Sequence, residues 1–94
     1  MTESLDERSR VTLSPSVYAR AFGEEVVLLE FGKGEYFGLD AVGAEVWRRL
    51  EAGDDLGMAA DHIVAQYEVS REEALRDIVA LVAELRDHEL LVPA

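Results

Sequence analysis

The periodicity of apolar residues changes once along the chain, at Asp40, and this change limits the possible folds. Before it, residues 25–31 are almost continuously apolar, which is typical of a central β-strand. Residues 17–22 form a weaker strand pattern upstream, and the glycines of residues 32–34 predict a tight turn before an aromatic strand at residues 35–39. The connections are of hairpin length. The first half of the chain therefore predicts a three-stranded antiparallel meander.

After this point the apolar residues recur at helical spacing, and capping residues divide the segment into three helices. Asp40 is placed to cap the first helix, and residues 53–55 end it and cap the second. Ser70 and Glu73 have the spacing of a capping box at the start of a long third helix, which extends to about His88. The expected fold class is α+β: a three-stranded antiparallel meander followed by three helices, with winged-helix-like character.

Length and charge restrict the class of protein. The 94 residues suffice for one small core, so we expect a single domain over residues 11–94, preceded by a disordered acidic tail at residues 1–10. Nine Lys and Arg residues against 20 Asp and Glu residues give a net charge of −11, which disfavours binding to nucleic acid. The sequence contains no cysteine, no signal sequence and no membrane-spanning apolar run, so we expect a cytoplasmic protein without membrane contact.

The residues that commonly carry catalysis are not arranged for it. His62 and His88 are far apart in the sequence and have no partners at metal-ligand spacing. No serine has a nucleophile motif around it, and residues 32–34 are too short for a phosphate-binding loop. The third helix begins with more acids than bases, which argues against a DNA-reading helix. We therefore expect no enzyme, no metal and no cofactor.

A three-stranded sheet with helices on one face leaves its edges open. The third predicted strand lies at such an edge, and a long helix beside it would complete a groove with an apolar wall. Two alternatives stay open at this stage. Tyr36 either fills the outer face of the sheet or anchors a partner there. The broad apolar stripe of the third helix is either simply buried or also walls the groove.

The order of these segments resembles the PqqD-like domains, which are precursor-peptide recognition elements of ribosomal peptide natural-product pathways. The pattern is mostly apolar spacing, and it covers nearly the whole chain except the acidic tail. With no fused domain, the sequence is most similar to the free-standing members of lasso-peptide biosynthesis. The matching segments are residues 25–29, 35–40, 42–50, 67–69 and 81–91.

This resemblance implies a non-catalytic protein. In the family, the leader segment of a precursor peptide adds a strand to the third strand and packs against the third helix. The domain then delivers the peptide, in lasso pathways to a separate cysteine leader peptidase. Alternatives are a pyrroloquinoline-quinone pathway peptide chaperone and a winged-helix protein-interaction scaffold. The expected leader-binding residues are Glu30, Glu35, Tyr36, Phe37, Gly38, Leu39, Leu75, Asp77, Ile78, Val79 and Val82.

Overall fold

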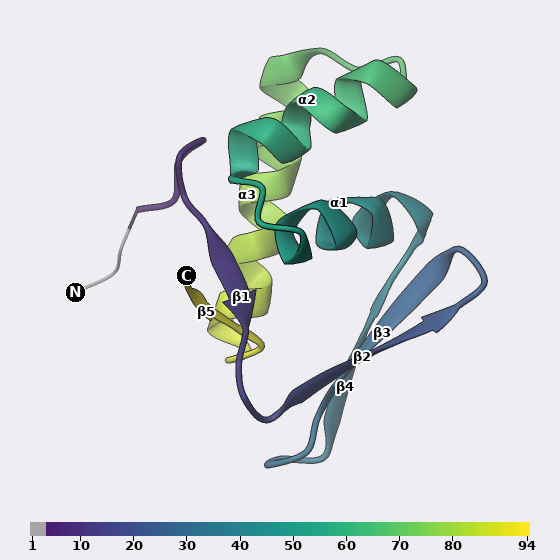
Figure 1. Ribbon diagram of the computed structural model, residues 1–94, viewed down its shortest axis with the longest axis vertical. Coiled ribbons are helices and arrows are strands. Elements are labelled where there is room, and N and C mark those ends of the chain that lie inside the picture. Colours follow the sequence, from purple (N-terminus) through teal and green to yellow (C-terminus); the bar gives the residue numbers. More distant parts are fainter. Residues whose placement is uncertain (1–3) are drawn as a thin grey trace.

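The computed structural model describes residues 4–94, and its elements form two small sheets and three helices (Figure 1). The sequence order confirms the α+β prediction, because three antiparallel strands precede three helices. The elements are β1 (Val11–Leu13), β2 (Val17–Phe22), β3 (Glu25–Glu30), β4 (Glu35–Leu39), α1 (Ala41–Glu51), α2 (Leu56–Gln66), α3 (Arg71–Asp87) and β5 (Leu91–Pro93).

The larger sheet has the order β2–β3–β4, with both pairs antiparallel. Leu28 of β3 lies between Ala19 of β2 and Phe37 of β4, and it is fully buried beneath the helices. Val27 and Leu29 point to the opposite face and are half-buried. The central strand thus carries apolar residues on both faces, which explains its nearly continuous apolar sequence.

A second sheet joins the two ends of the described chain. β1 pairs antiparallel with β5, so that Leu13 lies opposite Leu91. The Ser14 hydroxyl donates a 2.7 Å hydrogen bond to the carbonyl of Glu89, just before β5. Figure 1 shows this small sheet near the C-terminal end of α3, while the three-stranded sheet lies on the other side of the molecule, beside α1.

The three helices begin at the capping residues that the sequence predicted. Asp40, Asp55 and Ser70 have extended backbone angles, and each accepts a hydrogen bond from the main-chain N–H three residues later. These bonds satisfy N–H groups that have no partner within their helix. None of the helices in the described part of the chain combines the length and the apolar character needed to cross a membrane.

One core lies between the sheets and the helices. α1 packs against β3 and β4, while α3 packs against α2 and β5. The core includes the indole of Trp47, which is almost completely buried. Its largest fully buried side chains are Leu28, Leu56, Val82, Leu85 and Leu91.

The segment that precedes β1 contacts the start of α2. The carbonyl of Glu7 accepts a hydrogen bond from Gly57, where an added Cβ would lie only 3.0 Å from that oxygen. Arg71 bridges the carboxylates of Asp61 and Glu7, and the hydrogen bond to Asp61 is the main cause of its raised pKa. Of the tail expected from the sequence, residues 1–3 lie outside the described residues, and the domain boundary stays a prediction.

Candidate functional site

The edge of β4 is the starting point of the site. β4 pairs with β3 along one side, and no strand of the described chain pairs with its other side. Gly38, the fourth of its five residues, faces open space, since an added Cβ would meet no atom within 4 Å. Asp40 follows β4 directly and begins α1, so the strand is fixed against the first helix without an intervening loop.

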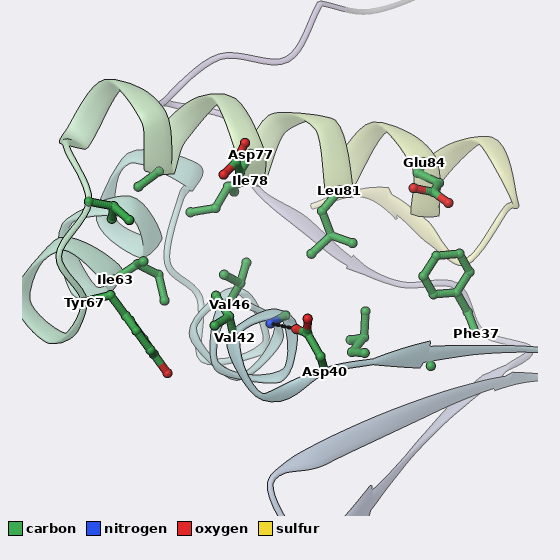
Figure 2. Close-up of a pocket in the computed structure, with 15 residues that line it drawn as sticks. Phe37, Asp40, Val42, Val46, Ile63, Tyr67, Asp77, Ile78, Leu81 and Glu84 are labelled. Atoms are coloured by element: carbon green, nitrogen blue, oxygen red, sulfur yellow. Dashed lines mark hydrogen bonds between the residues drawn. The ribbon is translucent and has the colours of Figure 1, made fainter.

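A groove of about 410 Å³ runs beside this edge. Figure 2 shows α3 along one side of the groove and the end of β4, followed by α1, along the other. The groove therefore combines main-chain groups of a strand with the side chains of all three helices. Its lining residues are Phe37, Gly38, Leu39, Asp40, Val42, Gly43, Val46, Ile63, Tyr67, Val69, Ala74, Asp77, Ile78, Leu81 and Glu84.

The α3 wall of the groove follows helical spacing. Ala74, Ile78 and Leu81 recur every three or four residues, so they lie on one face of the helix. Ala74 and Ile78 are buried, whereas Leu81 is half-buried and points into the groove (Figure 2). A ligand in the groove would cover the exposed part of Leu81 and so gain the free energy of apolar burial.

Carboxylates supply all the charge of the lining. Asp77 and Glu84 come from α3, and Asp40 comes from the opposite side (Figure 2). Asp40 accepts a 2.8 Å hydrogen bond from the Gly43 N–H and so has a structural role in addition. The lining contains no lysine, arginine or histidine. The groove is therefore apolar with an acidic rim.

A smaller hollow of about 300 Å³ continues along the strand toward the β3–β4 turn. Phe37 lines both hollows, and the centre of its ring lies 5.8 Å from that of His88. Lys33 of the turn forms a 3.3 Å ion pair with Glu89 beyond α3. Space is thus available beside β4 from its first residue to its last.

Seven of the residues expected from the sequence lie along β4 and the groove. Leader binding by them stays a prediction, but the structure brings them together in space. Phe37, Gly38, Leu39, Asp77 and Ile78 line the larger groove, and Glu35 and Tyr36 line the smaller hollow.

The other four expected residues lie elsewhere. Leu75 and Val79 are half-buried against the core and do not line the groove, and Val82 is fully buried. Glu30 is only 5% exposed, and its carboxylate accepts a hydrogen bond from the Gly32 N–H within the β3–β4 turn. Val82 and Glu30 therefore have little surface for a ligand, whereas Leu75 and Val79 are half-buried, and leader contact by these four residues stays a prediction.

Several groove residues were not expected from the sequence. On α3 these are Ala74, Leu81 and Glu84, which share the helical spacing of Asp77 and Ile78. The signal was present as an i, i+3, i+4, i+7 pattern, but it does not tell which of two neighbouring apolar faces borders the sheet edge. Val42 and Tyr67, which complete the groove from α1 and the end of α2, carry no comparable local signal.

The outer face of the sheet forms a second, separate surface. The register places Tyr18, Leu29 and Tyr36 side by side across the three strands. Tyr18 is 58% exposed and Tyr36 is 77% exposed, and the exposed ring of Phe31 contacts that of Tyr18. Tyr36 is thus exposed on the uncovered face of the sheet, and its role as an anchor for a partner stays a prediction.

The two histidines of the described chain have separate surroundings. His62 forms a 3.0 Å contact with Glu45 outside the groove, and His88 lies against Phe37. The described part of the chain contains no group of three histidines or carboxylates placed to hold a metal ion. What the site offers is an open strand edge, apolar walls and carboxylates.

Fold and site together define a small α+β binding domain, in which a sheet edge and a helix form the two sides of one groove. The chain belongs to the PqqD family: the family described as "Coenzyme PQQ synthesis protein D (PqqD)" matches residues 25–91. No curated protein matches the sequence.

Two solved structures are similar to this chain. TbiB1, in complex with the TbiA(beta) leader peptide, is 40% identical and has a TM-score of 0.80, with 84% of this chain and 92% of TbiB1 covered. A lasso peptide synthetase B1, complexed with the leader peptide, is 32% identical and has a TM-score of 0.85, with 90% of this chain and 100% of that chain covered.

Proposed function

We propose that this chain binds the leader segment of a ribosomal precursor peptide by strand addition to β4, without catalysing a reaction itself. The observation that carries the proposal is the open edge of β4, which lies directly beside an apolar groove. A peptide in extended conformation satisfies both features at once. Its main chain pairs with the strand, and every second side chain points toward α3.

The energetics suit a flexible peptide. Main-chain hydrogen bonds to β4 provide affinity that depends little on sequence, whereas the pocket beside Leu81 selects side chains. A disordered segment loses conformational entropy when it docks, and apolar side chains in the groove offset this cost. The two similar structures support the same interpretation, since both are complexes with a leader peptide.

The finer proposal is that the bound precursor is delivered to a separate cysteine leader peptidase during cytoplasmic lasso-peptide maturation. Delivery needs a second surface, because the leader occupies the groove. The aromatic outer face around Tyr18, Phe31 and Tyr36 is such a surface, since exposed clusters of this kind commonly bind protein partners. A tethered precursor then reaches the enzyme at a raised effective concentration.

Isothermal titration calorimetry tests leader binding. The ligands are the TbiA(beta) leader peptide and the leaders of short precursor peptides encoded near this gene. We expect saturable binding to one site by at least one of them, together with chemical-shift changes at β4 and α3 in a labelled sample. Absence of binding by the whole set, or shift changes confined to other surfaces, would contradict the proposal.

Tyr18→Ser tests delivery separately from binding. Tyr18 is exposed on the outer face of the sheet and lines neither hollow, whereas Phe37 lines both of them. We expect Tyr18→Ser to keep leader affinity while it slows leader cleavage by the peptidase, and Phe37→Ala to weaken binding about tenfold. Unchanged cleavage with the serine variant, at limiting protein concentration, would exclude this face from delivery.

A pyrroloquinoline-quinone pathway role is the second candidate, because the matching family is described by that synthesis. It uses the same groove and differs in the peptide bound. Titration with the precursor peptide of that cofactor distinguishes the two candidates: tighter binding of that precursor than of lasso leaders would favour the second one.

A further inference from the structure

The charged side chains of the groove lining indicate which ligand side chains the groove favours. All charged groups of the lining are carboxylates, and neither Asp77 nor Glu84 has an ion-pair partner among the described residues. Both side chains lie on the α3 side of the groove mouth, with Leu81 between them (Figure 2). This side of the groove therefore has an acidic, an apolar and a second acidic position in sequence.

The spacing of these positions matches that of an extended peptide. Along a helix, Leu81 lies about 6 Å from Asp77 and about 4.5 Å from Glu84, given a rise of about 1.5 Å per residue. Along a strand, side chains on one face recur about every 6.6 Å. Three side chains on one face of an added strand thus reach the three positions together, and long basic side chains absorb the difference of one or two Å.

We infer that the groove selects an extended peptide with the pattern basic–x–apolar–x–basic, in which Lys or Arg flanks one apolar anchor. The anchor covers Leu81, and the two cationic groups lie near Asp77 and Glu84. This inference rests on the proposed function and specifies which leaders the groove accepts. A leader with acidic residues at the flanking positions is repelled, because the lining has no cation to receive them.

Selection from a displayed library of random 15-residue peptides tests the inference without knowledge of the natural leader. The selection is performed on the wild-type protein and on the double variant Asp77→Asn, Glu84→Gln. We expect the wild-type protein to enrich the basic–x–apolar–x–basic pattern, and the double variant to keep the apolar anchor but lose the basic flanks. Titration of one enriched peptide and its Lys→Gln version should show a preference of roughly 1.4- to fivefold, the range for an exposed ion pair, and salt should reduce it.

A matched control separates local recognition from the general charge of the molecule. Glu51→Gln with Glu72→Gln removes the same amount of negative charge from exposed positions outside the groove. If the net charge of −11 alone attracted basic peptides, this control would lose the preference as well. We expect the control to select the same pattern as the wild-type protein, and loss of the pattern in the control would overturn the inference.

The remaining outcomes distinguish this inference from the proposed function. Enrichment of apolar peptides at the groove without any basic preference overturns the inference and leaves leader binding intact. If the selected peptides bind equally well when Leu81 is replaced by Glu, the groove is not their site, and the proposed function fails as well.

Discussion

The three-stranded sheet has two edges, and they differ in what surrounds them. β2 and β4 each pair only with β3 within the described chain, so both present main-chain groups on one side. β4 has the groove and α3 beside it, whereas no residue of β2 lines that groove. Open main-chain groups can pair with almost any extended chain. The strand edge thus provides pairing, and the neighbouring helix turns one of two similar edges into a selective site.

The difference originates in the connections of the two strands. β4 continues directly into α1 through Asp40, which holds its end against the helices. β2 follows Pro15 and turns into β3 through a short hairpin, at the far side from α3. Chain order thus determines which edge meets a helix.

The largest expected effect is that of proline substitutions, which should lower leader affinity when they are made in β4 but not in β2. In a strand, neighbouring N–H groups point to opposite sides, so one of Phe37→Pro and Gly38→Pro removes a donor from the open edge. We expect that variant to fold but to bind leader about 100-fold more weakly, because strand pairing loses bonds and is sterically blocked. The other variant loses a bond to β3 and should be destabilised. Calorimetry and circular dichroism measure both effects.

The corresponding pair in β2, Arg20→Pro and Ala21→Pro, is the control. Here the edge-directed proline should change leader affinity by less than about twofold, since no residue of β2 lines the groove beside α3. Equal losses of leader affinity for the β2 and β4 variants would mean that the leader does not distinguish the two edges. Full binding by both β4 variants would exclude strand addition.

The second prediction concerns the helix that makes β4 selective. Leu81 and Val79 are both half-buried on α3 and packed against the core, but only Leu81 lines the groove. We expect Leu81→Glu to weaken leader binding about tenfold or more, because a carboxylate replaces the apolar wall. Val79→Glu should lower the free energy of unfolding about as much as Leu81→Glu does. It should leave the leader affinity of the folded protein nearly unchanged. Urea denaturation and calorimetry give the two quantities.

This pair of variants also decides between two faces of α3. If Val79→Glu abolished binding while Leu81→Glu retained it, the leader would contact the face predicted from the sequence alone, and the groove would not be the site.

The smallest effect is expected at the N-terminal cap of α3. Ser70→Ala removes the acceptor for the Glu73 N–H and should lower the free energy of unfolding by about 1 kcal/mol. Leader affinity should change by less than about twofold, because the side chain of Ser70 does not line the groove. If Ser70→Ala lowered leader affinity together with stability, leader binding at the open edge would depend on the stability of the whole helix.

Local patterns predicted most of the fold. Asp40, Asp55 and Ser70 act through bonds to residues three positions away, so short-range sequence suffices to locate them. The pairing of β1 with β5 was not foreseen, since it joins two three-residue strands at opposite ends of the chain. Such pairing depends on where α3 ends in space, which no local pattern specifies.

The site was predictable only in part. The open edge follows from the meander, so Phe37 and Gly38 were found through strand order. The face of α3 that borders the groove could not be predicted from the sequence. Leu75, Val79 and Val82 form an equally apolar stripe beside Ile78. The angle at which a helix crosses a sheet depends on the packing of the complete core. A single sequence therefore indicates that α3 has a broad apolar surface without showing which part of it stays accessible.

The antiparallel pairing of β1 and β5 has a consequence for engineering. The amide of Ala94 donates a 3.0 Å hydrogen bond to the carbonyl of Arg10, so residue 94 lies next to the residue that precedes β1. A short linker can therefore join them, and new ends can be opened at a surface turn to give a circular permutant. Residues 10 and 94 also offer neighbouring attachment points for a fluorophore pair, whose energy transfer would report on unfolding.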